Sequence, residues 1–276
     1  MADGKRWLGV HLKDDGELGN AALLDCAHLA EELGFSAVTM NEDVGHDSFA
    51  LLGALARETQ RITLGTAIVN VYTRSAMQLA MGAATVDDLS GGRALLGLSV
   101  GHHPWNDQYH GIPLEAPLPR LREYVAFLRG VLSGEEYHHE GKVFRGVSTK
   151  LHFPPLRSDL PIHVGGDRAG ILKVAGEIAD GAILNVVSPG YIESFAADRF
   201  FSSAEAVGRD PSTLELTAIV TCCLTPDRDE AIARAKRSFV RRIGTNPEKM
   251  ADTRGAEAKV EIAHLAELIA AGRAEQ

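Results

Sequence analysis

Residues 62–100 read ITLGTAIVNVYTRSAMQLAMGAATVDDLSGGRALLGLSV, with an aliphatic run at each end of a longer segment. The two outer runs, residues 62–69 and 93–100, are rich in aliphatic and β-branched residues, which favour strands. The middle segment, residues 76–89, has the apolar period of a helix. A strand, a helix and a strand in this order predict a βαβ unit with a parallel sheet.

The same alternation continues on both sides of this unit. Towards the amino terminus, strands are predicted at 8–12 and 36–41. Each is followed by a helix, one from Asn20 as N-cap to residue 33 with Gly34 as its stop, and one from Asp47 as N-cap. Towards the carboxyl terminus, three more strands are predicted at 161–165, 181–187 and 214–224, with helices at 119–132, 169–179, 191–207 and 229–243. The chain therefore contains seven predicted βα units.

Three segments interrupt or follow this repeat. Residues 101–118 form a long loop, which we expect at the carboxyl-terminal face and which by its length is typical of a functional loop. Residues 134–160 hold aromatic residues, glycines and prolines and are interpreted as a hairpin-like insertion over the barrel mouth or its flank. Residues 244–276 read as helix without an eighth strand. Either the chain is cut before its last βα unit or the barrel closes by other means.

The fold class predicted from this count is α/β, a (β/α)8 TIM barrel that lacks its last βα unit, as one domain over residues 1–276. A doubly wound open sheet is the alternative. That architecture normally carries a glycine fingerprint directly after the first strand, and residues 11–16 read HLKDDG. The barrel is therefore favoured.

Composition excludes several kinds of partner. The formal net charge is −9, so no overall attraction to nucleic acid or to an anionic membrane is expected. No leader segment opens the chain, and no apolar run reaches the roughly 18 to 20 residues that span a bilayer. A cytoplasmic protein that binds small molecules is expected. The three cysteines, Cys26, Cys222 and Cys223, have neither disulfide nor metal spacing and are predicted to be buried free thiols.

Four stretches resemble signatures of the luciferase-like superfamily. They are ALARETQRITLGT at 54–66, DDLSGGRALLG at 87–97, RLREYVAFLRGVLSGE at 120–135 and AGEIADGAILN at 175–185. The resemblance covers about residues 8–245. Within the superfamily, AIVNVYTRSA at 67–76 is similar to the third strand of methylenetetrahydromethanopterin reductases and their bacterial relatives, which use the deazaflavin coenzyme F420. The resemblance also implies a homodimer.

The resemblance implies specific features at the third strand and two departures beyond it. The peptide bond between Ala67 and Ile68 is expected to be cis and to support the back of the deazaflavin ring. Where relatives have an acid and a histidine after the second strand, this chain has Glu42 and Asp43. Where F420 enzymes often have an acid after the fourth strand, it has His102. The proton chemistry is therefore expected to differ.

Active-site groups of a barrel come from the carboxyl ends of its strands. The candidate catalytic residues are His11, Glu42 and His102. His11 either bonds a ring edge and exchanges a proton or is an ordinary satisfied polar group. Glu42 is either an acceptor or an acid of raised pKa beside the ring, or a helix-capping surface acid. The adjacent His102 and His103 lack a third ligand, so no metal is expected, and His138 and His139 are predicted to be solvated.

Candidate coenzyme-binding residues follow the strands and open the fifth helix. Those at strand ends are Ala67, Ile68, Asn70, Tyr72 and Gly101. The stretch Gly165, Gly166, Asp167, Arg168 precedes the helix at 169–179 and offers backbone N–H groups, a helix amino terminus and a cation to a phosphate.

Three functions are compatible with this reading. The first is an F420-dependent oxidoreductase that transfers a hydride between the coenzyme and a small organic substrate. The second is a monooxygenase that uses reduced FMN and oxygen, because the same barrel hosts both chemistries. The third is a non-catalytic flavin-binding barrel, to which the altered acid pair and the missing strand point.

Overall fold

The computed structural model describes residues 7–13, 18–101, 103–145, 148–245, 247–253 and 256–273. The chain divides into two compact units. The first comprises Met1–Ile183 and Phe200–Thr217, and the second comprises Leu184–Arg199 and Ala218–Gln276. The single domain expected from the length stays a prediction. Among the described residues, none of the helices has the length and apolarity that crossing a membrane requires.

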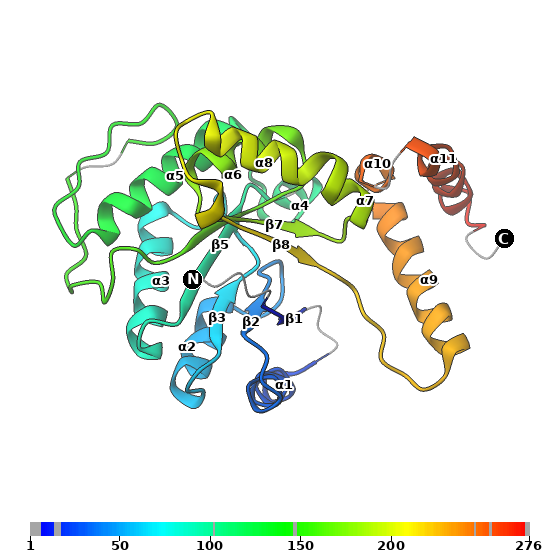
Figure 1. Ribbon diagram of the computed structural model, residues 1–276, viewed down its shortest axis with the longest axis horizontal. Helices are drawn as coiled ribbons and strands as arrows, with labels where there is room; N and C mark the ends of the chain where they lie inside the picture. Colours follow the sequence, from blue (N-terminus) through cyan, green and yellow to red (C-terminus); the bar gives the residue numbers. More distant parts are fainter. Residues whose placement is uncertain are drawn as a thin grey trace. The chain divides into compact units, whose positions relative to one another are not determined.

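The strands form one sheet in the order β1-β2-β3-β5-β6-β7-β8, with β4 beside β5. Figure 1 labels β1, β2, β3, β5, β7 and β8 of this sheet. Their bounds are β1 Gly9–Leu12, β2 Ala37–Met40, β3 Thr63–Thr66, β4 Val69–Asn70, β5 Ala94–Ser99, β6 Ile162–Gly165, β7 Gly181–Asn185 and β8 Glu215–Ile219. Pairing from β1 to β7 is parallel. β3 and β4 are two halves of the predicted third strand, so all seven predicted strands are present.

The sheet curves into a nearly closed barrel. No strand follows β8 among the described residues, as the sequence predicts. The outer strands of the sheet are β1 and β8. A side-chain hydrogen bond joins residues at these two edges, since Trp7 Nε1 donates to Glu215 Oε2 at 3.2 Å.

The helices alternate with the strands. Their bounds are α1 Asn20–Glu32, α2 Ser48–Glu58, α3 Ala76–Ser90, α4 His103–His110, α5 Pro117–Leu132, α6 Ala169–Ile178, α7 Pro189–Tyr191, a π-helical turn Ile192–Ala196, α8 Ala197–Glu205, a 3-10 turn Pro211–Thr213, α9 Arg228–Thr245, α10 Pro247–Asp252 and α11 Ala256–Ala270. Asp47 caps α2 as predicted and accepts from Ala50 N at 2.9 Å. The N-cap of α1 is Gly19 rather than Asn20. The predicted long loop contains α4.

The second unit has a small core of its own. Ile243 of α9, Met250 of α10 and Ile262 of α11 are buried together. Partly buried apolar residues of α9 and α11 pack around them, including Phe239 and Leu265. The helical reading of residues 244–276 is thus confirmed for α10 and α11.

The turn from α3 to β5 explains why DDLSGGRALLG is a distinctive stretch. Asp87 is 1% exposed, and its carboxylate accepts from Arg157 Nη2 at 2.7 Å and from Ala94 N at 3.1 Å. Gly91 and Gly92 have φ values of 68° and 88°, which favour glycine. The Arg93 guanidinium donates to the carbonyl oxygens of Ala56, Thr59, Ile62 and Ser90. The motif therefore ties α2, α3 and β5 together.

The insertion at 134–160 is held on the outer flank of α5. Two isolated antiparallel bridges, Tyr137 with Thr149 and Glu140 with Arg145, give it a hairpin-like course without regular strands. The predicted solvation is wrong for His139, which is 5% exposed and stacks on Phe144 with 4.3 Å between ring centroids. The reason is that these rings pack against Phe127 of α5. His138 is exposed, in agreement with the prediction.

Burial of the cysteines was a wrong prediction. The strand predicted to reach residue 224 ends at Ile219, whose carbonyl accepts from Val186 N. Cys222 therefore lies beyond the sheet and is exposed, while Cys223 and Cys26 are half-buried. All three thiols are free, as predicted.

His163 on β6 links stability to pH. Its side chain is 2% exposed, and burial lowers its pKa from 6.5 to about 4, against the opposing influence of Asp180. The unfolded chain therefore takes up a proton near pH 6.5 and the folded protein only near pH 4. The contribution of neutral His163 to the free energy of unfolding is therefore fully present above about pH 6.5. It is lost as the pH falls from there towards about 4.

We expect the free energy of unfolding to fall by about 2 to 3 kcal/mol across this window, measured by urea unfolding at several pH values. A His163→Gln variant should lose much less over the same range, because it removes the titrating group. An equal loss in the variant and the parent protein would contradict this assignment.

Candidate active site at the carboxyl ends of the strands

The carboxyl ends of the parallel strands meet at one edge of the first unit, where the predicted residues gather. His11 lies on β1 opposite Thr39 of β2. Its Nδ1 is 3.1 Å from Thr39 Oγ1, and the side chain is half-buried. The imidazole is therefore oriented by a neighbouring strand.

The third strand is broken between β3 and β4, where the peptide bond joining Ala67 to Ile68 is cis. The cis bond agrees with the expectation from the resemblance, and the support of a ring at this position stays a prediction. Gly65 pairs with Leu95 and Val69 with Leu98, so four steps along this strand match three along β5. The extra residue makes a bulge in the strand.

The bulge is held by contacts on both sides. Thr66 Oγ1 donates to Gly97 O at 2.7 Å and accepts from Gly97 N at 3.0 Å. On the other side, Glu42 N donates to Ile68 O at 3.2 Å. Gly165 lies against Ile68, because a Cβ at Gly165 would be 2.6 Å from Ile68 Cγ2. The ends of β2, β4 and β6 therefore meet at Ile68.

Two buried amides close the edge beside the bulge. Asn70 Nδ2 donates to Asn106 Oδ1 at 2.7 Å, and Asn106 Nδ2 donates to Val100 O at 3.2 Å. Asn70 Oδ1 accepts from Tyr72 N at 3.0 Å. Gly101 has a φ of 70°, and a Cβ there would be 2.4 Å from Asn70 Nδ2. Sequence reasoning missed Asn106, whose only signal was a polar residue within the long loop.

Tyr72 fixes the segment that precedes α5. Its hydroxyl donates to Glu115 O at 2.6 Å, and the ring is buried. Arg120 Cζ lies 4.4 Å from the ring centroid, in a cation–π contact. Burial raises the pKa of the Tyr72 hydroxyl, and the charge of Arg120 partly offsets this. The tyrosine is therefore a neutral group that orders the rim of the site.

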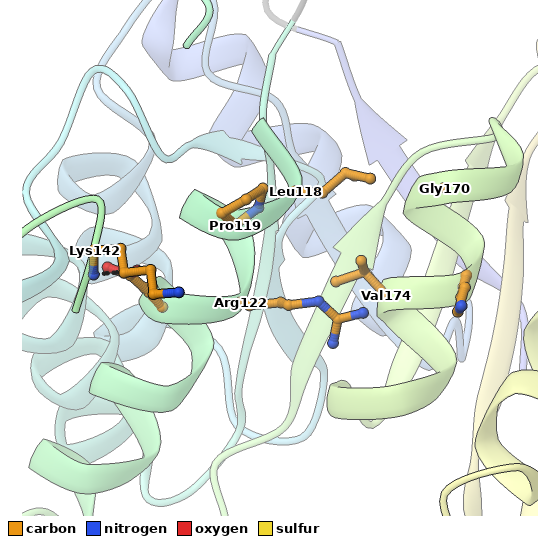
Figure 2. A pocket seen from close by; sticks show the side chains of 8 residues that line it. Leu118, Pro119, Arg122, Lys142, Gly170 and Val174 are labelled. Carbon is orange, nitrogen blue, oxygen red and sulfur yellow. Dashed lines mark hydrogen bonds between the residues drawn. The ribbon is translucent and has the colours of Figure 1, made fainter. Parts of the chain in front are cut away.

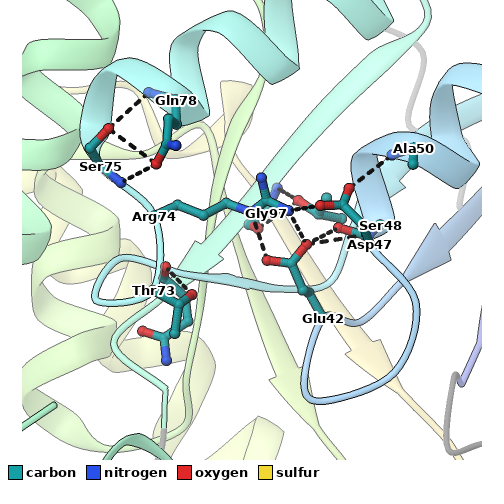
Figure 3. A network of polar contacts seen from close by, with 11 residues as sticks. Glu42, Asp47, Ser48, Ala50, Thr73, Arg74, Ser75, Gln78 and Gly97 are labelled. Atoms are coloured by element: carbon teal, nitrogen blue, oxygen red, sulfur yellow. Dashed lines mark hydrogen bonds and ion pairs between the residues drawn. The ribbon is translucent and has the colours of Figure 1, made fainter. Parts of the chain in front are cut away.

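Glu42 lies in a network of polar contacts with Arg74, which the sequence analysis did not single out (Figure 3). Arg74 Nε donates to Glu42 Oε1, and Nη2 donates to Oε2, both at 2.7 Å. Ser48 Oγ donates to Glu42 Oε2 at 2.9 Å. Arg74 also pairs with Asp47.

The network stabilises the charged forms of Arg74 and Asp47. The hydrogen bond to Glu42 raises the pKa of Arg74. Although partial burial acts against it, the backbone N–H of Ala50 and the Arg74 guanidinium hold the pKa of Asp47 below its usual value. Both Glu42 oxygens accept from Arg74, which favours a positioning role. A role of Glu42 as proton donor or acceptor stays a prediction.

The stretch from Gly165 to Arg168 connects β6 to α6, as predicted. Gly166 N is committed to Ile183 O at 3.0 Å, so this N–H is not available to a ligand. Asp167 is buried, and Arg168 is the exposed N-cap of α6. In the described part of the chain, the backbone N–H groups of Arg168, Ala169 and Gly170 make no hydrogen bond to another backbone group. These three N–H groups suit an anion.

The remaining predicted residue, His102, lies outside the described residues. Within those ranges, no group of three or more His, Cys, Asp or Glu side chains is placed to hold a metal ion. The edge thus brings together backbone at Ala67 and Ile68, the amide of Asn70, the imidazole of His11 and the amino terminus of α6.

A separate cavity of about 530 Å³ lies between α5 and α6 (Figure 2). It is lined by Leu118, Pro119, Arg122, Glu123, Lys142, Gly170, Lys173 and Val174. None of the predicted site residues lines it, although Gly170 adjoins the loop at 165–168. Arg122 is paired with Glu177 there. This cavity is flanked by helices and is distinct from the strand ends.

Comparison with known proteins adds a family and a set of relatives. The family model described as luciferase-like monooxygenase matches residues 10–276. A 5,10-methylenetetrahydromethanopterin reductase of Methanolobus tindarius is 33% identical over 247 residues, which cover 84% of this chain and 74% of that protein. The enzyme of the same name from Archaeoglobus fulgidus is 29% identical over 204 residues, which cover 74% of this chain and 60% of that protein.

A solved structure agrees with these relatives. The coenzyme F420 dependent tetrahydromethanopterin reductase of Methanopyrus kandleri superposes with a TM-score of 0.84 at 26% identity. The match covers 98% of this chain and 81% of that one.

Proposed function

Because the chain belongs to the luciferase-like monooxygenase family, we propose that it is a coenzyme F420-dependent oxidoreductase acting on a small organic substrate. The relatives' names favour a reduced pterin as the substrate class. The observation that carries the proposal is the bulge between β3 and β4 at Ala67 and Ile68, against which Gly165 packs without a side chain. The homodimer and the cytoplasmic location expected from the sequence remain part of the proposal.

The residues at the strand ends fit a flat coenzyme ring. Gly165 has no side chain, which leaves room for the Ile68 side chain at the break. We assign the backbone of Ala67 and Ile68 to an apolar wall behind the ring. Asn70 holds a fixed amide beside this wall. When bound, a deazaflavin carries two electrons as a hydride, so the protein's task is to orient the ring and the substrate and to exclude water.

The amino terminus of α6 fits the coenzyme's phosphate. The backbone N–H groups of Ala169 and Gly170 lie in the first turn of α6, where a helix favours negative charge. The exposed Arg168 adds a cation. Gly166 offers no hydrogen-bond donor to the phosphate, because its N–H donates to the carbonyl oxygen of Ile183.

His11 and Glu42 have different roles in this proposal. The half-buried imidazole of His11 lies at the edge of the site, and an imidazole can both donate and accept a proton, so we assign His11 to proton exchange with the substrate. The Glu42 carboxylate accepts a hydrogen bond from Arg74, and the Glu42 backbone N–H donates to the carbonyl oxygen of Ile68. We therefore assign Glu42 to the support of the bulge.

A second candidate, a monooxygenase that uses reduced FMN, is favoured by the description of the matching family model. Titration of the purified protein with F420 and with FMN, followed by fluorescence quenching, separates the two. We expect F420 to bind at least about tenfold more tightly than FMN, which corresponds to about 1.4 kcal/mol. Tighter binding of FMN, with oxygen-dependent oxidation of its reduced form, would replace the first proposal by the second.

Gly165→Ala should weaken F420 binding by about tenfold, because the added Cβ displaces the Ile68 side chain and reshapes the back wall. The same quenching titration measures it. The contact is with a side chain that can shift, so the variant should still fold. Gly53→Ala is the matched control, since its Cβ meets nothing closer than 4.0 Å. Equal affinities in the two variants would argue against a ring at Ile68.

A further inference from the structure

Cys222 and Cys223 are adjacent free thiols in the second unit, in the segment between β8 and α9. Cys222 is exposed and Cys223 is half-buried. The neighbouring Val220 and Leu224 are 70% and 95% exposed. Oxidants and thiol reagents can therefore reach this pair from solvent, whereas the proposed redox site makes no use of it.

The backbone around the pair is not fixed by a hydrogen-bond ladder. Among the described residues, the N–H and C=O groups of 221–224 make no recorded backbone hydrogen bond. The Cys222 thiol has only a long contact of 4.0 Å with Val220 O. The segment is therefore free to adopt the turn that a bond between the two sulfurs requires.

A cation lies beside the less exposed thiol. Arg234 on α9 pairs with Glu230 and also interacts with Cys223. Glu230 first, and Cys223 after it, raise the pKa of Arg234. The thiolate form of a cysteine is the nucleophile in disulfide chemistry.

We propose that Cys222 and Cys223 form a redox-active vicinal dithiol, a modification site that a peroxide or a small disulfide oxidises reversibly. One thiolate attacks the oxidant, and the second displaces the leaving group from the first sulfur. With hydrogen peroxide, a bond forms between the two Sγ atoms, the two thiols lose two protons and two electrons, and the peroxide is reduced to two water molecules. A thiol reductant reverses the step.

Geometry makes such a disulfide labile rather than structural. Adjacent Cα atoms lie about 3.8 Å apart across a trans peptide, below the usual range of about 4.4 to 6.8 Å for disulfides. The ring that would form is therefore strained, and strained, exposed disulfides are the easily reduced ones. The geometry therefore favours a reversible redox role for the pair over a structural disulfide.

The test is a thiol count on the full-length protein before and after limiting hydrogen peroxide, with denaturation in thiol-free buffer before counting. The parent protein has three thiols and should retain one, that of Cys26. Dithiothreitol should restore all three, and a peptide map should place the loss of two hydrogens in the peptide that holds Cys222 and Cys223. Phenylarsine oxide, which bridges two thiols, should protect the reduced pair.

Single variants distinguish a pair from two independent thiols. Cys223→Ser should lose its thiol at Cys222 about tenfold more slowly and should no longer bind phenylarsine oxide tightly. Cys26→Ser should behave as the parent protein does. Tight phenylarsine oxide binding by Cys223→Ser, irreversible oxidation of the parent protein, or disulfide-linked dimers through Cys222 would overturn the proposal.

Discussion

Gly97→Ala is expected to destabilise the protein by about 4 kcal/mol or more. A Cβ at Gly97 would lie 2.1 Å from the backbone oxygen of Thr66 and 2.9 Å from Ile183 Cδ1. The first atom belongs to the backbone that enters the bulge, and Thr66 Oγ1 also bonds the N–H and C=O of Gly97. Neither strand can move away without losing these bonds. Urea unfolding measures the loss.

Gly53→Ala is the control for this substitution. Gly53 lies inside α2, and its Cβ would have no neighbour closer than 4.0 Å. Alanine there should stabilise the protein by up to about 1 kcal/mol, because it favours helix over the unfolded chain. A parent-like stability for Gly97→Ala would mean that β3 and β5 do not approach as closely as described.

Asp87→Ala is expected to cost about 3 to 4 kcal/mol. The Asp87 carboxylate is 1% exposed and accepts from Arg157 Nη2 and from Ala94 N. Its removal leaves the Arg157 guanidinium, which is 27% exposed, without its carboxylate. Removing one partner of a buried ion pair is costly, because it leaves the other charge without its counter-ion. Chemical unfolding of the variant and the parent protein at pH 7 gives the difference.

The adjacent Asp88 provides a matched control, because its side chain is exposed on the same helix. Asp88→Ala should change the stability by less than about 0.5 kcal/mol. Similar losses in the two variants would show that Asp87 contributes through general charge rather than through the bonds to Arg157 and Ala94.

Asp87 and Gly97 are the two ends of the stretch DDLSGGRALLG, which is distinctive in the sequence itself. The alternation of strands and helices follows from local patterns, so seven strands and the lack of an eighth among the described residues were predicted correctly. The cis bond between Ala67 and Ile68 was expected from resemblance to other proteins and not from local pattern. Nothing in the residue types alone distinguishes that segment from an ordinary strand.

Other features depend on partners that lie far away in the sequence. Glu42 was expected either beside the ring or as a helix-capping acid, and its pairing with Arg74, 32 residues later, was not anticipated. His139 was expected in solvent, whereas the rings of Phe144 and Phe127 bury it. The buried amide of Asn106 on α4 bonds Asn70 at the end of β4, 36 residues earlier in the sequence. Contacts of this kind are fixed by tertiary packing, which patterns within one segment cannot report.

A crystal structure of the protein with coenzyme F420 would test the central claim most directly. We predict that the ring lies at the carboxyl ends of the strands against the backbone of Ala67 and Ile68, with the phosphate at the amino terminus of α6. A coenzyme bound instead in the cavity between α5 and α6, with the strand ends empty, would contradict the account.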